Sequence, residues 1–361
     1  AVLLDWRLLD MDGKKIELHV HLDSTWRHST LLELAKKRNI QLPGIESVED
    51  MRKACVTDKP QGLSHFLKPH KLIAPIYHGN LDGYERLAYE YCEDVAKNGV
   101  IYAEVRVVPH RCFSPDQQRQ VGYDGLVEVI RRISHGLTRA EQDLDIKTKI
   151  ILTAMYGHPT WSMQETLRLC QHHWDKGVVG LDLCTWQPEQ SKVDEAPVVE
   201  EVQFLMDEAR KSSIYRTIHA GEVSGAAAIE RAAYKLQSDR VGHGYHVVQD
   251  EKLYARCLRD RVHFECCPYS SFLTAAVPTN CAEHPIFRFA EDGANFSLSS
   301  DDPTLTGHYV DGDYKLARSF GLTDQHLAQA NLNAAKAAFL QESEKTELIK
   351  EICKSYGLED K

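Results

Sequence analysis

Short apolar runs alternate along the chain with longer stretches in which apolar residues recur every three or four positions. Most runs are continuous, which is typical of parallel strands that are covered on both faces. The eight predicted strands are residues 16–22, 100–106, 148–154, 178–184, 215–219, 240–243, 262–266 and 295–300. Segments with helical spacing lie between most of these strands, one of them over residues 198–209.

This order of elements predicts an α/β fold, a closed (β/α)8 TIM barrel. A doubly wound open sheet is the alternative, but the glycine-rich loop G-x-G-x-x-G that usually follows its first strand is absent. The first crossover, about residues 24–98, contains several helix-like stretches and is expected to be a helical lid insertion. Residues 324–356 are expected to add C-terminal helices, so that residues 1–361 form a single barrel domain.

Composition narrows the class of partner. The chain has 361 residues, 43% of them hydrophobic, and a formal net charge of -10 without a cluster of basic residues. We therefore expect no nucleic-acid partner, and a small neutral or cationic molecule rather than a polyphosphate. Ten cysteines without a C-x-x-C pair indicate reduced thiols and a cytoplasmic location. No apolar run approaches the ~20 residues that cross a membrane, and no signal peptide is visible.

Polar residues gather at the predicted ends of four strands. In the first strand, His19 and His21 are two positions apart and therefore face the same way, which makes half of a metal site. The polar residues at the other strand ends are His219, Glu222, His243, Asp301 and Asp302. Barrel enzymes keep their active sites at the carboxyl ends of the strands, so these residues are candidates for one shared site.

The residue types indicate a metal-assisted hydrolysis. His19, His21 and His219 are candidate imidazole ligands and Asp301 is the candidate carboxylate ligand of one catalytic zinc ion. Zinc lowers the pKa of water to about 7 and so supplies hydroxide for attack on an electrophilic carbon. A two-metal site is less expected, because the fourth predicted strand contains no lysine that could bridge two ions.

Three further residues are candidates for proton transfer. Glu222 in a partly dry pocket would hold its proton and act as an acid, although it could instead cap the following helix. His243 is the candidate that steers the attacking water or accepts its proton, with His246 as the rival. Asp302 is expected to point away from Asp301 if the backbone is extended there, and to contact substrate or water.

Six segments together carry a family resemblance. They are residues 17–23 (ELHVHLD), 217–222 (TIHAGE), 240–246 (RVGHGYH), 267–271 (CPYSS), 299–303 (SSDDP) and 331–336 (NLNAAK). In this order they closely resemble the adenosine deaminases of the amidohydrolase superfamily, and they cover nearly the whole chain.

The resemblance implies one Zn²⁺ per chain, and the ligands would be His19, His21, His219 and Asp301. It implies that Glu222 protonates the purine ring nitrogen beside the amino-bearing carbon, and that His243 and Asp302 activate and orient the attacking water. The implied reaction is hydrolysis of adenosine or deoxyadenosine to inosine or deoxyinosine and ammonia. The implied partner is a small purine nucleoside, and we expect the protein to be a monomer.

The resemblance also implies substrate contacts. Asp23 would bind a ribose hydroxyl, Phe66 and Leu67 would form an apolar lid, and the Thr185 backbone N–H would meet the purine. The implied substrate-binding set is His21, Asp23, Thr185, Asp302, Phe66 and Leu67.

Three departures from the family concern the substrate. Thr185 and Trp186 replace a usual glycine and its neighbour, Ser24 replaces a glycine, and His70 stands where the lid often has an aromatic residue. The alternatives are a related purine deaminase acting on adenine, a modified nucleoside or a nucleoside monophosphate, and a purine-binding protein with weak turnover. Asp23 argues against a phosphate, because a carboxylate repels it.

Overall fold

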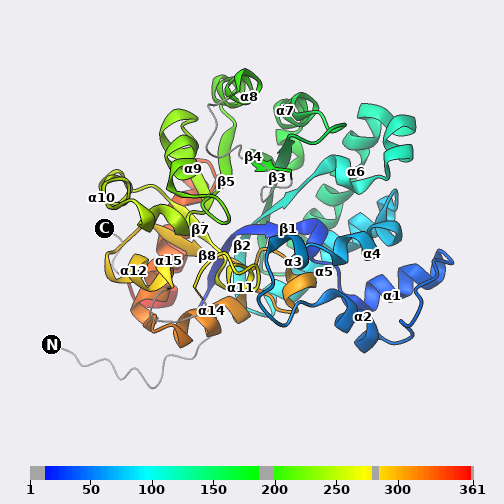
Figure 1. The fold of residues 1–361 in the computed structure, drawn as a ribbon, viewed down its shortest axis with the longest axis horizontal. Coiled ribbons are helices and arrows are strands. Elements are labelled where there is room, and N and C mark those ends of the chain that lie inside the picture. The colour runs from blue at the N-terminus through cyan, green and yellow to red at the C-terminus, as the bar shows by residue number, and fades with distance from the viewer. Residues whose placement is uncertain (1–12, 187–198, 279–283, 359–361) are drawn as a thin grey trace.

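Eight parallel strands form one sheet in the computed structural model, which describes residues 13–186, 199–278 and 284–358. The strands are β1 (Lys15–His21), β2 (Val100–Val107), β3 (Lys147–Tyr156), β4 (Val178–Thr185), β5 (Tyr215–Ala220), β6 (Arg240–His243), β7 (Phe264–Cys266) and β8 (Phe296–Leu298). Each pairs with the next in sequence, and a parallel bridge between Val20 and Asp301 connects the end of β8 to β1. The predicted (β/α)8 barrel is confirmed (Figure 1).

Helices surround the strands (Figure 1). The first crossover contains α1 (His28–Lys37), α2 (Val48–Cys55), α3 (Leu63–Phe66), α4 (Pro69–Tyr77) and α5 (Leu81–Ala96). After β2 come α6 (Pro115–Asp143), α7 (Met163–His172), α8 (Glu200–Lys211), α9 (Ala226–Glu230), α10 (Glu251–Asp260), α11 (Pro268–Leu273) and α12 (Pro285–Glu291). After β8 come α13 (Pro303–Thr306), α14 (Val310–Ser319), α15 (Asp324–Ala337) and α16 (Glu342–Tyr356).

Single helical turns complete the connections. The 3₁₀ turns are η2 (Leu22–Ser24), η3 (Pro109–Cys112), η4 (Trp174–Lys176) and η7 (Tyr245–Gln249), and η6 (Arg231–Lys235) is a π-helical turn. No helix in the described ranges is long and apolar enough to cross a membrane.

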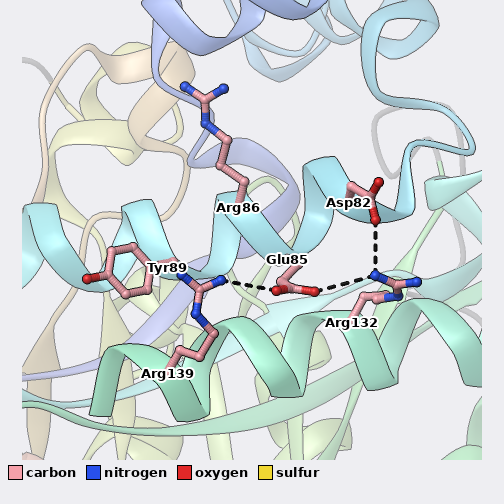
Figure 2. A pocket seen from close by; sticks show the side chains of 6 residues that line it. All are labelled: Asp82, Glu85, Arg86, Tyr89, Arg132 and Arg139. Carbon is pink, nitrogen blue, oxygen red and sulfur yellow. Dashed lines mark hydrogen bonds and ion pairs between the residues drawn. The ribbon is translucent and has the colours of Figure 1, made fainter. Parts of the chain in front are cut away.

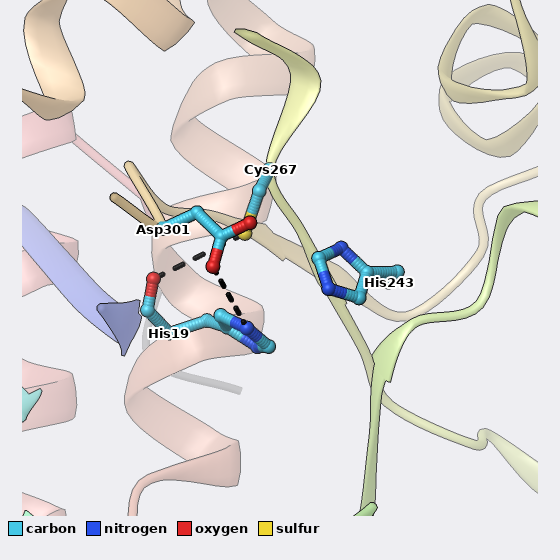
Figure 3. A group of neighbouring side chains, drawn as sticks. All are labelled: His19, His243, Cys267 and Asp301. Carbon is cyan, nitrogen blue, oxygen red and sulfur yellow. Dashed lines mark hydrogen bonds and ion pairs between the residues drawn. The ribbon is translucent and has the colours of Figure 1, made fainter. Parts of the chain in front are cut away.

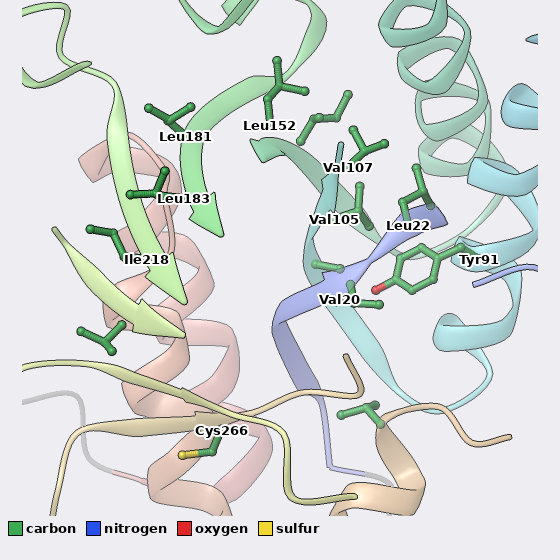
Figure 4. Packing of buried hydrophobic residues seen from close by; sticks show 14 of the residues in the cluster. Val20, Leu22, Tyr91, Val105, Val107, Leu152, Leu181, Leu183, Ile218 and Cys266 are labelled. Carbon is green, nitrogen blue, oxygen red and sulfur yellow. The ribbon is translucent and has the colours of Figure 1, made fainter. Parts of the chain in front are cut away.

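Apolar side chains from neighbouring strands pack into one buried cluster. Val20, Val105, Leu152, Leu181 and Ile218 come from β1 to β5 and belong to this cluster (Figure 4). Each apolar side chain removed from water contributes about 1.5–3 kcal/mol, so the continuous apolar strands account for the packed barrel. These strands also carry buried charged residues, which support the site described below.

The C-terminal helices pack against the first strand. Ile16 and Leu18 of β1 form a buried cluster with Leu332 of α15 and Ile352 of α16. The predicted helical segment 324–356 is therefore two helices, with a break after Ala337. The structure brings α3 to α13 through a contact cluster of Phe66 and Leu305, but whether the first crossover acts as a lid stays a prediction.

Candidate active site

The four predicted metal ligands lie together at the carboxyl ends of β1, β5 and β8. The Nε2 atoms of His21 and His219 are 3.2 Å apart. The Nε2 atoms of His19 and His21 are each 3.4 Å from Oδ1 of Asp301. Figure 3 shows the Asp301 carboxylate directed at the His19 ring. Residues that are far apart along the chain thus present three imidazoles and one carboxylate to a common point.

The second nitrogen of two of these rings is held by a buried carboxylate. Oε2 of Glu265 lies 2.7 Å from Nδ1 of His19, and Oδ1 of Asp182 lies 3.0 Å from Nδ1 of His219. A carboxylate at Nδ1 fixes the proton there and turns the Nε2 lone pair toward the cluster. Among the described residues, the buried Nε2 of His19 has no hydrogen-bond partner. This donor set fits a Zn²⁺ ion, which prefers imidazole and carboxylate ligands in a tetrahedral arrangement with one position open.

The sequence analysis missed this supporting layer. Arg106 Nη2 donates to Glu265 at 2.7 Å, and Arg106 Nη1 lies 3.5 Å from Asp182. Arg240 Nε donates to the other oxygen of Glu265 at 2.7 Å. Burial works to raise the pKa of Glu265, but Arg106 and Arg240 outweigh it and hold this pKa well below its usual range. A charged residue inside an apolar strand was the available signal, since Asp182 and Glu265 interrupt β4 and β7.

The adjacent aspartates have opposite proton affinities. Burial opposes ionisation of Asp301, but its hydrogen bond and attraction to His19 hold its pKa well below the ordinary value. The Ser270 hydroxyl donates to the other oxygen of Asp301 at 2.7 Å. Burial and the charge of Asp301 raise the pKa of Asp302 well above its ordinary value, while a hydrogen bond with Ser24 lowers it. Asp301 is therefore the anionic ligand candidate, and Asp302 is the carboxyl with the higher proton affinity.

The backbone is strained at two of these positions. Asp301 has φ +61° and His243 has φ +62°, in the left-handed region that costs a residue other than glycine about 1–3 kcal/mol. The backbone at Asp301 is therefore not extended, so the condition under which Asp302 was expected to point away from Asp301 is not met. Asp302 is the N-cap residue of α13, but its side chain makes no capping hydrogen bond.

A close approach explains one glycine beside the cluster. A Cβ atom on Gly242 would lie 3.0 Å from Cε1 of His19, which is closer than side chains normally pack. The absence of that atom lets β6 approach the His19 ring.

Glu222 and His243 face each other across the site. Oε2 of Glu222 lies 3.6 Å from Nε2 of His243. The helix after β5, α9, has Gly225 as its N-cap residue, so the structure does not support a capping role for Glu222. Nδ1 of His243 is buried and has no hydrogen-bond partner in the described ranges. The acid and the water-orienting candidate are thus close enough to act on one substrate.

His246, the rival of His243, is engaged elsewhere. Its Nδ1 lies 2.6 Å from the carbonyl oxygen of Ser224, and its Nε2 lies 2.7 Å from that of Ala276. Both ring nitrogens therefore hold loops together, which favours His243 for the chemistry.

Cys267 also faces the cluster from the end of β7 (Figure 3). Burial, together with the charges of Asp301 and Asp313, raises the pKa of this thiol well above its ordinary value. The sequence analysis did not single out Cys267, although its Sγ lies with ligand atoms of His19, His243 and Asp301 that are all within 4.8 Å of one another.

The candidate sugar contact is a buried ion pair. Asp23 is fully buried and accepts a hydrogen bond from Arg111 Nη1 at 3.1 Å through Oδ2. Its other oxygen, Oδ1, is buried without a hydrogen-bond partner among the described residues. The sequence analysis did not single out Arg111, and nothing in the pattern around it distinguishes it from a surface arginine. Nearby, Nε2 of His70 lies 3.2 Å from the hydroxyl of Ser24.

The two predicted apolar lid residues differ in exposure. Phe66 is buried against Leu273 and Leu305, whereas the side chain of Leu67 is 36% exposed. Thr185 is partly buried at the last position of β4.

Trp186 packs against two other rings. Its ring centroid lies 4.6 Å from that of His158 and 5.7 Å from that of Trp161.

A pocket between two outer helices is not a candidate for this chemistry. It has a volume of about 300 Å³ and lies between α5 and α6 on the outside of the barrel. Its charged side chains pair with one another, as where Arg132 contacts both Asp82 and Glu85 (Figure 2).

Fold and site together define the chain as a barrel enzyme of the amidohydrolase type. Comparison with known proteins gives the family: the family model described as adenosine deaminase matches residues 14–355, and the chain belongs to the adenosine deaminase family. It is similar to the adenosine deaminase of Rattus norvegicus, with 39% identity over 95% of this chain and 97% of the relative. With the adenosine deaminase of Gallus gallus the identity is 37%, covering 95% and 96%.

Solved structures share the fold. An adenine deaminase from Arthrobacter aurescens matches with TM-score 0.80 and 23% identity, covering 95% of this chain and 98% of that one. An amidohydrolase from Burkholderia ambifaria with bound Zn matches with TM-score 0.80 and 23% identity, covering 97% and 92%. An N6-methyl-AMP deaminase from Arabidopsis thaliana matches with TM-score 0.77 and 22% identity, covering 95% and 97%. The chain is therefore a hydrolase of the deaminase family.

Proposed function

We propose that this enzyme catalyses zinc-dependent hydrolytic deamination of adenosine and deoxyadenosine, with release of inosine or deoxyinosine and ammonia. The observation that carries the proposal is the convergence of His19, His21, His219 and Asp301, with buried carboxylates fixing two of the rings. The family membership and the Zn-containing amidohydrolase of the same fold support it.

We propose one Zn²⁺ per chain, held by His19, His21, His219 and Asp301. When bound, zinc would lower the pKa of water to about 7 and so provide hydroxide at neutral pH. The chain's own contribution is to hold these four side chains in place before the ion arrives. Glu265 and Asp182 do this by accepting the Nδ1 protons of His19 and His219.

We assign proton transfer and orientation of the attacking water to Glu222, His243 and Asp302. We assign to Glu222 the proton that the purine ring nitrogen gains as the neighbouring carbon is attacked. His243, 3.6 Å from Glu222, takes or orients the proton of the attacking water. Asp302 is buried, and we assign to it the orientation of the attacking water and contact with the substrate. Ammonia then leaves from the attacked carbon.

The remaining candidate residues are assigned to substrate binding. The unpartnered Oδ1 of Asp23 is an acceptor for a ribose hydroxyl, and the Thr185 backbone N–H is a donor for the purine. Phe66, Leu67 and His21 would complete the pocket wall. The partner is then a small purine nucleoside. We also propose that the protein is a monomer. We propose a cytoplasmic location, which the nine free cysteines among the described residues support.

The direct test is an ultraviolet assay of purified enzyme with adenosine, deoxyadenosine, methylthioadenosine, adenine and AMP. We expect the two nucleosides to be converted fastest, with one ammonia released per purine. Preferential turnover of adenine or AMP would replace the proposed substrate with one of the alternatives, and zinc binding without ammonia release from any purine would indicate a binding protein.

A further inference from the structure

Three residues that interact electrostatically with Arg111 each carry a buried polar atom without a hydrogen-bond partner among the described residues. These atoms are Oδ1 of Asp23, Nδ1 of His70 and the Tyr77 hydroxyl. We call Asp23, Ser24, His70, Tyr77 and Arg111 the polar wall. Its members come from η2, from α4 in the first crossover and from η3 after β2.

The Asp23–Arg111 pair leaves hydrogen-bonding capacity unused on both partners. Only Oδ2 of Asp23 is taken, by Arg111 Nη1 at 3.1 Å. Arg111 has further N–H groups, and its side chain is 22% exposed whereas that of Asp23 is fully buried. A buried oxygen without a partner destabilises the protein, so this arrangement gains stability when a ligand group donates to Oδ1.

His70 extends the same wall from α4. Its Nε2 is engaged by the Ser24 hydroxyl at 3.2 Å, which leaves Nδ1 without a partner in the described part of the chain. Burial and the nearby Arg111 charge lower the pKa of His70 to about 3, so the ring is neutral at physiological pH. Ser24 also lowers the pKa of Asp302, so the wall is close to the catalytic side of the site.

The charge balance of the wall selects the kind of ligand. One cation, Arg111, faces one carboxylate, Asp23, and His70 is neutral. A phosphate dianion would meet a cation that is already paired, and it would also lie close to the Asp23 carboxylate, which repels it. A neutral hydroxyl can donate to Oδ1 of Asp23 and accept from Arg111 or His70. The wall therefore suits hydroxyl groups and not a phosphate.

We propose that Arg111 and His70 are specificity-determining residues that recognise, together with Asp23, the hydroxyl groups of the substrate's sugar. This inference rests on the proposed deaminase function and goes beyond the ribose contact of Asp23. Two of the departures from the family pattern, His70 and Ser24, contact each other. The inference gives this pair a role in sugar recognition.

The test compares adenosine with its 2′-, 3′- and 5′-deoxy analogues and with AMP, using the wild type, His70→Phe and Arg111→Leu. We expect at least one deoxy analogue to have a kcat/KM about 10- to 100-fold lower than adenosine in the wild type. In each variant, the ratio of kcat/KM for adenosine to kcat/KM for that analogue should be smaller than in the wild type. The reason is that kcat/KM for adenosine falls, whereas kcat/KM for the analogue stays nearly unchanged. The matched controls are His172→Phe and Arg131→Leu, on the outer surface, which should leave every ratio unchanged.

Two results would overturn the inference. If both variants lowered kcat/KM by the same factor for adenosine and for all three deoxy analogues, the polar wall would have only a structural role. A wild-type preference for AMP that Arg111→Leu removes would make it a phosphate site. Because Arg111→Leu leaves a buried carboxylate unpaired, thermal melting checks its fold, and His70→Phe keeps the ion pair intact.

Binding measurements separate this inference from the proposed function. Calorimetric titration with inosine and its deoxy analogues makes the same comparison without turnover. An enzyme that releases no ammonia from adenosine but still discriminates these ligands would contradict the function and not the wall. Ammonia release with equal affinity for all four ligands would contradict the wall and not the function.

Discussion

The metal-ligand cluster and the polar wall lie beside each other and are built in opposite ways. In the cluster, carboxylates of the protein hold Nδ1 of His19 and His219 at 2.7 and 3.0 Å, and two buried arginines hold those carboxylates. In the wall, buried atoms of Asp23 and His70 have no partner in the described ranges. The protein fixes in advance the groups whose geometry the chemistry requires, and leaves hydrogen-bonding capacity where a variable ligand part must be recognised.

Removal of one ligand should give the largest effect. His219→Ala takes away one of the imidazoles that converge on the cluster, so we expect loss of bound zinc and a fall in deaminase activity to the detection limit. Elemental analysis and an ammonia assay on the same sample measure both. The exposed His172→Ala serves as the control and should keep both properties. Full zinc occupancy in His219→Ala would remove His219 from the ligand set.

Replacement of the proton donor should separate catalysis from metal binding. Glu222→Gln keeps the size of the side chain but removes its acid function, so kcat should fall about 10²- to 10⁴-fold. Zinc content should stay at the wild-type value, because Glu222 is not a proposed ligand. Near-normal turnover would refute its role as the acid.

A smaller effect is expected in the layer behind the ligands. Glu265→Gln and Asp182→Asn remove the charges that fix His19 and His219, so zinc affinity should weaken about 10- to 100-fold. Competition with a fluorescent chelator measures the affinity. Glu128→Gln, which removes a carboxylate paired with Arg131 and Arg132 on α6, should leave zinc affinity unchanged. Equal zinc affinities for the wild type and all three variants would show that Glu265 and Asp182 do not support the metal site.

The smallest effect belongs to the purine side. Thr185→Gly restores the residue type that the family usually has after the fourth strand, so we expect a modest rise in kcat/KM for adenosine. Steady-state kinetics at saturating zinc measures it. A large loss would mean that the pocket has been rebuilt around the threonine.

Periodicity and strand-end residues predicted most of the fold and the convergence of the candidate ligands. A parallel barrel places the carboxyl ends of its strands on one face, so the positions of His19, His21, His219 and Asp301 along the chain were enough to predict their convergence. Strand ends were less predictable: β7 and β8 are only 3 residues long, because few of their residues pair with neighbours.

The rest depends on contacts between distant segments. Arg111 pairs with a residue 88 positions away, and no local pattern distinguishes that arginine from an exposed one. The positive φ angles of His243 and Asp301 are imposed by the surrounding barrel, since neither residue type requires such a backbone.

The most direct measurement of the central claim follows deaminase activity while zinc is removed and restored. Purified enzyme is stripped with a chelator, and ammonia release from adenosine is recorded as Zn²⁺ is added back against a known protein concentration. The account predicts no activity in the stripped enzyme and a linear recovery that ends at one zinc per chain. Full activity in metal-free enzyme, or recovery that does not depend on intact His19, His21, His219 and Asp301, would contradict it.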